Sequence, residues 1–178
     1  SSLGLLAAKA NFHIFMEKPM TTNALEALDL YAAAEQMKCH GKVFMVNHSA
    51  NFRQQALKAR EFVGSGRIGE IQHVTCYMIR EREFFEDSKN RLWVSSFEAS
   101  TGNGFAWGQS CHNLAWVYMV TTLRPQSVYC KMVRSTETGA DIFTSAIIEC
   151  RNGAIITCQG LAGLPGGNSV GNSASKTG

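Results

Sequence analysis

The sequence has no run of basic residues and little net charge. Its 17 lysines and arginines stand against 14 aspartates and glutamates, which leaves a net charge of +3 over 178 residues. The densest charged patch, Arg80-Glu81-Arg82-Glu83, alternates in sign and therefore cancels itself. Because nucleic-acid-binding domains carry a basic patch or stripe, we expect no nucleic-acid partner.

The cysteines show neither a CxxC pair nor the spacing of zinc ligands. Apolar residues make up 45% of the chain, enough to bury a core without covalent cross-links. We therefore expect reduced, mostly buried thiols in a cytoplasmic protein, with no metal site and no disulfide framework. The six residues are Cys39, Cys76, Cys111, Cys130, Cys150 and Cys158.

No signal peptide or membrane anchor is evident. The chain starts without a methionine, a basic segment or a cleavage site. Residues 99–123 contain no Asp, Glu, Lys or Arg and would suit a membrane span by their length. They begin in a Gly-rich stretch, however, and include Gln109, His112 and Asn113, so a loop followed by a buried helix is the better interpretation.

The first fifty residues alternate between helix and strand patterns. Helices are predicted over residues 3–10 and from Thr22-Asn23 to about residue 38, with Asn23 as the cap and Glu26 as its capping-box partner. Short apolar strands are predicted over residues 13–16 and 42–47. This rhythm is typical of a parallel α/β sheet.

The pattern changes after residue 48. Helices are predicted over 53–64 and 107–121, the second apolar nearly all round and hence buried, and strands over 71–79, 126–134, 142–150 and 154–159; residues 81–96 are hard to place. Asn152-Gly153 favours a tight hairpin turn between the last two strands. Successive strands without helices indicate an antiparallel sheet. We therefore expect the tail of a doubly wound domain followed by an α+β domain with an open sheet.

Both ends read as truncated, since the chain starts inside a helix and its last residues are rich in Gly, Ser and Asn. A parallel strand such as 13–16 needs neighbours and cover on both faces. We therefore expect a fragment that is aggregation-prone or partly molten by itself.

Three polar motifs are candidates for chemistry. Glu17-Lys18-Pro19 follows a predicted strand, at the edge where open α/β sheets bind ligands, and a half-buried lysine there can exchange a proton with a substrate oxygen. Lys18-Pro19 is a candidate for a cis peptide bond. The alternative is a surface strand end with an ordinary ion-paired lysine.

The second motif runs from Gly102 to His112 and begins with glycines that let the backbone approach a ligand closely. Gln109 and His112 are three residues apart and share one helix face. An imidazole can take a hydroxyl proton near neutral pH, although a core histidine bonded to a carbonyl remains an alternative.

The third motif, Asn47 to Arg53, lies at the crossing between the two predicted domains. Polar residues after a strand often line a cleft. A solvated linker with a helix cap is equally consistent with this stretch.

In this order the motifs resemble those of the Gfo/Idh/MocA family of NAD(P)-dependent oxidoreductases. The matching segments are Ala10–Met20, Val46–Phe52, Gly66–Val74 and Gly102–Trp116, and the similarity extends from residue 1 to about residue 160. The resemblance implies the C-terminal remnant of a Rossmann dinucleotide-binding domain over residues 1–48. Over residues 49–178 it implies an α+β domain, incomplete at its C-terminus, whose large open sheet serves substrate binding and homo-oligomerisation.

The resemblance also implies roles for individual residues. Lys18 would lie between nicotinamide and substrate, and His112 would contact the reacting hydroxyl of a sugar, cyclitol or related small molecule. The cofactor, NAD or NADP, would meet Glu17, Pro19 and Asn47, and the substrate would meet Arg53, Trp107 and Gln109.

Two features depart from the family pattern. The family's Asp, four residues before the histidine, is replaced by Gly108, which leaves the proton relay without its carboxylate. The Gly-x-Gly-x-x-Gly fingerprint for the pyrophosphate is absent from the chain. Three interpretations therefore stay open: an oxidoreductase, a NAD-dependent glycosidase or epimerase of the same fold, and a non-catalytic nucleotide-binding or interaction protein.

Overall fold

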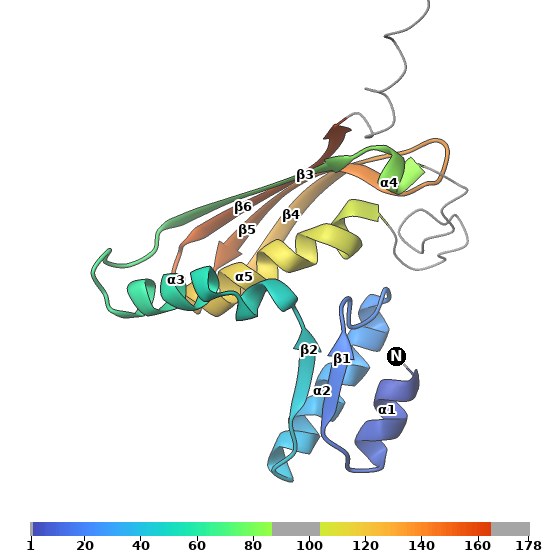
Figure 1. The fold of residues 1–178 in the computed structure, drawn as a ribbon, viewed down its shortest axis with the longest axis vertical. Helices are drawn as coiled ribbons and strands as arrows, with labels where there is room; N and C mark the ends of the chain where they lie inside the picture. The colour runs from blue at the N-terminus through green and yellow to red at the C-terminus, as the bar shows by residue number, and fades with distance from the viewer. Residues whose placement is uncertain (1, 87–103, 165–178) are drawn as a thin grey trace, which may run out of the picture.

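The computed structural model describes residues 2–86 and 104–164 (Figure 1). The first part forms a small α/β unit, called the N-terminal unit below. It consists of α1 (Ser2–Lys9), β1 (Ile14–Glu17), α2 (Ala24–Cys39) and β2 (Phe44–Asn47). Strands β1 and β2 pair in parallel, with Ile14 opposite Phe44 and Glu17 opposite Asn47. The predicted helix–strand–helix–strand order is confirmed.

Helix α2 begins where the sequence supplies a cap. The side chain of Asn23 accepts hydrogen bonds from the backbone N–H groups of Leu25 and Glu26, which the first turn of a helix leaves unpaired. The hydroxyl of Thr21 donates to the Glu26 carboxylate at 2.7 Å. The helix ends before Gly41, whose φ of 68° is the left-handed conformation in which glycine terminates helices.

Residues 49–164 form the C-terminal unit. Its elements are η1 (Ser49–Phe52), α3 (Gln54–Gly64), β3 (His73–Glu81), α4 (Glu83–Glu86), the π-helical turn η4 (Ala106–Ser110), α5 (Cys111–Thr121), β4 (Pro125–Arg134), β5 (Asp141–Cys150) and β6 (Ile155–Leu164). The four strands make one sheet in the order β3-β6-β5-β4. The β5–β6 connection turns at Gly153, which has a φ of 84° as the predicted hairpin requires.

The sheet is mainly antiparallel, as predicted, but its edge strand β3 pairs in parallel with β6. The reason is that the chain crosses from β3 through η4 and α5 before it enters β4, so β3 is not joined to its neighbour by a hairpin. Strand β6 also continues to Leu164, beyond the predicted end at residue 159.

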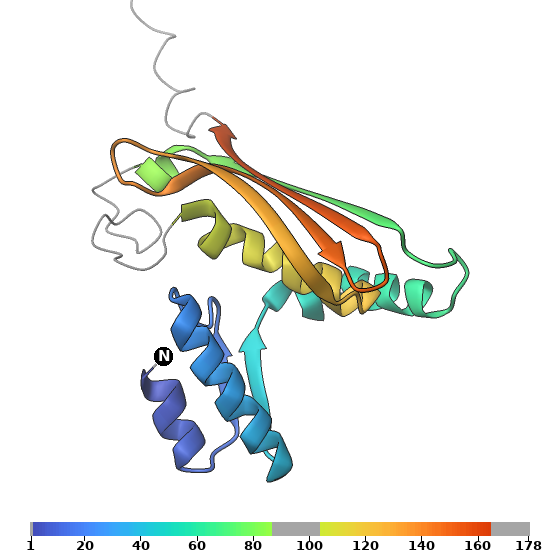
Figure 2. The same ribbon diagram turned by 180° about the vertical axis from the view of Figure 1, so that it is seen from behind.

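Helices α3 and α5 cover one face of this sheet, the face turned toward the N-terminal unit (Figures 1 and 2). The core has two clusters. One is Phe85, Phe105, Ala140, Ile142 and Ala162; the other is Val117, Leu123, Ile148, Cys150, Ala154 and Ile156. Among the described residues, no helix covers the opposite face of the sheet.

Two predictions about burial and one about helix geometry need correction. Helix α5 is buried only at Val117 and Val120 and is otherwise half-exposed, because it packs on the sheet with one side. Its start is a π-helical turn, which hydrophobic periodicity does not reveal. All six cysteines are free thiols, but Cys39 and Cys130 are exposed and two others are only half-buried.

The Gly-rich stretch before η4 was predicted to let the backbone approach a ligand. At Gly104, the described glycine of this stretch, the backbone instead approaches another part of the protein, Asp141. Gly104 has a φ of 83°, and a Cβ there would lie 2.2 Å from Oδ1 of Asp141. Asp141 is buried and accepts a hydrogen bond of 2.9 Å from the backbone N–H of Ala106, so its carboxylate fixes the start of this helix. Gly102 and Asn103 lie outside the described residues.

Within the part of the chain that the structure describes, no helix combines the length and the apolar character that a membrane span requires. The charge-free segment accordingly contributes η4 and α5 to the face of a sheet.

Candidate active site

Lys18 reaches from one unit into the other. It follows β1 directly, and the cis Lys18–Pro19 peptide comes next. Its Nζ donates a hydrogen bond of 3.0 Å to the backbone carbonyl of Gly108 in η4, ninety residues along the chain. The ammonium is half-buried and lies at the junction of the two units.

The π-helical turn explains why a carbonyl is available at that place. In a π-turn the hydrogen bonds run from residue i to i+5, which widens the helix and displaces carbonyls from the ordinary ladder; such turns are frequent at functional sites. The oxygen that accepts from Lys18 belongs to the main chain of this turn, at Gly108.

Two imidazoles meet beside this ammonium. His112 lies in the first turn of α5, and His48 follows β2; their ring centroids are 6.0 Å apart and the rings are nearly perpendicular. Burial lowers the pKa of His112, and the neighbouring charges of Lys18 and His48 lower it further. Burial and Lys18 likewise lower the pKa of His48. Both rings are therefore neutral at pH 7.

The ends of the two parallel strands are bridged by a hydrogen bond. Asn47 Nδ2 donates to Glu17 Oε1 at 2.6 Å, and the other carboxylate oxygen of Glu17 accepts from the backbone N–H of Lys18 at 3.3 Å. These contacts hold Glu17 at the strand edge.

The polar stretch from Asn47 to Arg53 contacts helix α5. Asn51 donates to the carbonyl of Ala115 in α5 at 3.2 Å, and His48 faces His112. A cavity of about 340 Å³ opens beside His112. It is lined by Ala50, Arg53, Gln55, Ala56, Met78, His112, Asn113 and Trp116.

Of the predicted site residues, Arg53 and His112 line this cavity. The others are not among its lining residues: Glu17, Lys18, Pro19, Asn47, Trp107 and Gln109. Trp107 and Gln109 are half-buried in η4. Pro19 is half-buried directly after Lys18.

Sequence reasoning did not assign a role to three residues that contribute to this region. Trp116 and Asn113 line the cavity, and His48 contacts His112. His48 lies within the third predicted motif, Asn47 to Arg53, but that motif gave it no role of its own. For Trp116 and Asn113 the signal was hidden in a helix that looked apolar all round.

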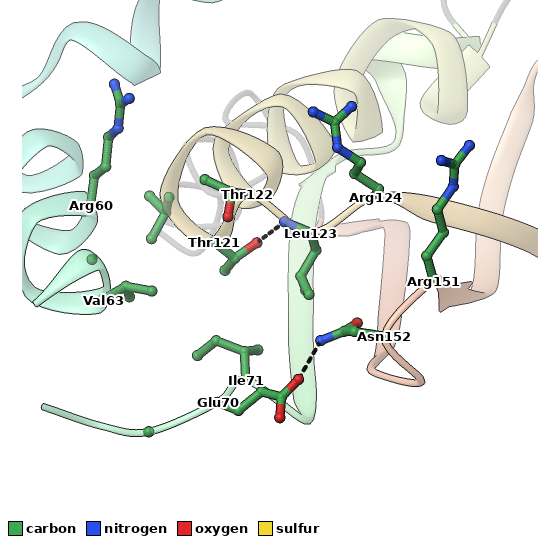
Figure 3. A pocket seen from close by; sticks show the side chains of 13 residues that line it. Arg60, Val63, Glu70, Ile71, Thr121, Thr122, Leu123, Arg124, Arg151 and Asn152 are labelled. Atoms are coloured by element: carbon green, nitrogen blue, oxygen red, sulfur yellow. Dashed lines mark hydrogen bonds between the residues drawn. The ribbon is translucent and has the colours of Figure 1, made fainter. Parts of the chain in front are cut away.

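A second cavity, of about 510 Å³, lies at the other end of α5 (Figure 3). Arg60, Arg124 and Arg151 point along its rim, and Asn152 Nδ2 donates to Glu70 Oε1 at 3.2 Å. It is lined by the last residues of α5, nine residues or roughly 14 Å along the helix from His112. The predicted catalytic residues do not line it.

Among residues 2–86 and 104–164, no three His, Cys, Asp or Glu side chains are grouped closely enough to hold a metal ion.

Two curated proteins have related sequences. A 2,7-anhydro-N-acetylneuraminate hydratase of Escherichia coli K12 is 33% identical over 98 residues, which are 54% of this chain and 24% of that protein. A 1-carboxy-3-chloro-3,4-dihydroxycyclohexa-1,5-diene dehydrogenase of Comamonas testosteroni is 27% identical over 169 residues, 88% of this chain and 38% of that one. The chain thus spans less than two fifths of the length of these relatives.

Solved structures share the fold. The WlbA dehydrogenase of Chromobacterium violaceum, in complex with NADH and UDP-GlcNAcA, superposes with a TM-score of 0.71 at 20% identity, over 90% of this chain and 45% of that one. The model of the GFO/IDH/MocA C-terminal domain matches residues 56–173, well over half of the sequence. The chain therefore belongs to the Gfo/Idh/MocA family.

Proposed function

We propose that the intact protein transfers a hydride between a nicotinamide cofactor, NAD or NADP, and a hydroxyl-bearing carbon of a sugar, cyclitol or related small molecule. The observation that supports this most is the convergence of Lys18, held against Gly108, with the neutral imidazole of His112. The NADH in the related WlbA complex and the dehydrogenase name of the Comamonas protein support the cofactor class. The compound in the name of the Comamonas protein carries two hydroxyl groups and a carboxy group on a ring.

The described residues fit the nicotinamide end of such a cofactor. The carboxyl ends of β1 and β2 form the edge at which parallel sheets bind ligands. There the buried Nδ1 of His48 has no hydrogen-bond partner among the described residues, so a donor or acceptor remains for a bound molecule. Glu17, Pro19 and Asn47 would line the cofactor side. When bound, the oxidised nicotinamide accepts the hydride.

The protein's own groups handle the proton. As the C–H bond of the carbinol breaks and its hydride leaves, the hydroxyl proton moves to the neutral imidazole of His112, and a carbonyl forms. The Lys18 ammonium stabilises the negative charge that develops on the oxygen. Because its own acceptor is an uncharged carbonyl, the positive charge of Lys18 is not cancelled there.

Lys18 provides the direct test. Absorbance at 340 nm should follow the reaction of the intact protein with a panel of polyols and sugars, with NAD and with NADP. Lys18→Ala should lower kcat by about 10²- to 10⁴-fold, the usual contribution of a positioned acid–base group. Lys58→Ala, on the exposed side of α3, is the matched control and should leave kcat unchanged. Equal rates in the two variants would contradict the proposal.

A second candidate keeps the cofactor but returns the hydride. The Escherichia coli relative is named a hydratase, a reaction name without net oxidation. In a glycosidase or epimerase of this kind the product forms while no NADH accumulates. Chromatographic detection of product without a change in absorbance at 340 nm would favour this alternative.

The open face of the sheet is where we propose that a second copy of the chain binds. It exposes apolar side chains on neighbouring strands: Tyr77, Ile79, Tyr129, Val133, Phe143, Ile147 and Ile155. Exposed apolar patches of this kind are typical of protein interfaces. Light scattering of the intact protein should give the mass of an oligomer, and Phe143→Lys should shift it toward the monomer. An unchanged mass would contradict this interface.

A further inference from the structure

The cavity beside His112 contains a cation and no carboxylate. Of the side chains that line it, Arg53 is positively charged, and none is Asp or Glu. Within residues 2–86 and 104–164, the Arg53 guanidinium makes no ion pair or hydrogen bond. Arg53 and His112 line the same cavity. Burial lowers the pKa of His112 most, followed by the charges of Lys18 and His48, and the charge of Arg53 contributes least.

The surroundings add positive charge without balancing it. The Lys18 ammonium is bonded to the uncharged carbonyl of Gly108. The one carboxylate that acts on both imidazoles, Glu17, is engaged by Asn47, and its influence on each pKa is smaller than that of Lys18. A neutral ligand would leave this excess of charge uncompensated, whereas a monoanion would balance one cation.

The remaining lining supplies donors and apolar walls. Asn113 lines the cavity, and its side chain also hydrogen-bonds to the Cys158 thiol. Trp116 and Met78 form apolar walls on which the C–H face of a ring can lie. At about 340 Å³, the cavity lies at the lower end of the range for small-molecule pockets.

From this combination we propose that the substrate carries a carboxylate, and that Arg53 binds this carboxylate in the cavity while the reacting carbinol lies between His112 and Lys18. A carboxylate is planar, and its two oxygens match the fork of a guanidinium, so the pair forms two parallel hydrogen bonds. A carboxylate on Arg53 balances one cation and leaves the Lys18 charge for the oxygen of the reacting carbinol, which favours a monoanion over a phosphate dianion. This inference names the substrate class and rests on the proposed function.

Binding and turnover should be measured separately on the intact protein. The probes are matched pairs of an acid and its neutral sugar, glucuronate with glucose and galacturonate with galactose, together with glucose 6-phosphate. Calorimetry in the presence of NADH reports binding whether or not a reaction follows. We expect tighter binding of at least one acid than of its neutral partner.

The variants test the assignment to Arg53. Arg53→Met should weaken binding of that acid about 10- to 100-fold, as expected for a lost charge-assisted hydrogen-bonded pair, and leave the neutral sugar unaffected. Arg53→Lys should restore part of the loss because it keeps the charge but not the fork. Arg53 and Arg60 are both exposed, but Arg53 precedes helix α3 and lines this cavity, whereas Arg60 lies within α3 and lines the second cavity. Arg60→Met is therefore the matched control and should bind like the wild type.

Several results would overturn the inference. They are failure of every acid to bind, equal binding of acid and neutral sugar, tighter binding of glucose 6-phosphate than of either acid, or equal losses in Arg53→Met and Arg60→Met. The proposed function fails differently: binding of the acid depends on Arg53, but no variant or substrate gives hydride transfer or product.

Discussion

The two units of this chain use similar apolar sequences with different results. In the N-terminal unit, residues 2–47, the buried apolar side chains are those of Ile14, Leu30 and Met37, while Leu3, Phe15 and Leu25 are each more than 60% exposed. The C-terminal unit, residues 49–164, contains both core clusters. The difference shows that an apolar pattern predicts whether a segment forms a helix or a strand. Whether its side chains are buried depends on the neighbouring elements that cover it.

Strand geometry accounts for the exposed side chains of the N-terminal unit. Phe15 and Met45 are register partners, so they lie on the same face of the two-stranded sheet, and both are exposed. A cavity of about 560 Å³ also separates parts of α1 and α2. A parallel sheet requires cover on both faces, and within the described residues this one has it on a single face.

The largest expected effect distinguishes the cores of the two units. Phe105 is fully buried and stacks on Phe85 at 5.1 Å, so Phe105→Ala should cost about 3–5 kcal/mol of unfolding free energy in the C-terminal unit. Leu30→Ala should cost about 2–5 kcal/mol, but in the N-terminal unit alone. Amide hydrogen exchange measured at increasing urea concentrations gives the unfolding free energy of each unit separately. Equal loss of protection everywhere in both variants would show that they unfold as one.

A smaller effect comes from overpacking of the same core. A Cβ on Gly160 would lie 2.3 Å from the ring of Phe105, so Gly160→Ala should destabilise the C-terminal unit by about 1–3 kcal/mol. Gly64→Ala, at a position with no atom within 4 Å, should change stability by less than about 1 kcal/mol. Urea denaturation gives both values, and indistinguishable midpoints would mean that the Phe105 ring moves aside.

The third prediction concerns pH. Burial raises the pKa of the Asp141 carboxyl above its ordinary value of 3.8. The folded state therefore binds this proton more tightly than the unfolded state, and stability falls as the pH rises through the window that starts near 3.8 and ends at the raised value.

Asp141→Asn does not titrate, so the free energy of unfolding of the variant should rise relative to that of the wild type as the pH increases from acidic to neutral. Urea denaturation at several pH values is the measurement. A constant difference between wild type and Asp141→Asn would contradict this prediction.

The smallest effect tests the link between the two units. Burial lowers the pKa of His48 and of His112 most, and the charge of Lys18 lowers both further. Lys18→Met should therefore raise both pKa values toward 6.5, whereas Lys58→Met should leave them as they are. NMR titration of the imidazole protons measures this. Unchanged values in Lys18→Met would mean that the ammonium does not stay at the junction.

The order of elements was predictable from local signals. Asn23 marked the start of a helix because an asparagine side chain can cap the first backbone N–H groups. Gly153 marked a hairpin turn because glycine readily adopts a positive φ. The parallel pairing of β3 with β6 was missed because it depends on where the chain returns after α5.

The site was predictable to a smaller extent. Lys18 and His112 could be singled out from motif order, but the hydrogen bond of Lys18 to the π-helical turn at Gly108 leaves no clear pattern in sequence. Trp116 was missed because its place beside the cavity is decided by how α5 packs.

The oxygen that accepts the hydrogen bond of Lys18 belongs to the main chain. A side-chain acceptor at that position could be deleted by a single codon change, whereas a peptide carbonyl is present whichever amino acid is encoded. The acceptor for the Lys18 ammonium therefore depends on the course of the helix backbone and not on the identity of one side chain. Mutational drift at position 108 can crowd this contact, but it cannot remove the atom that makes it.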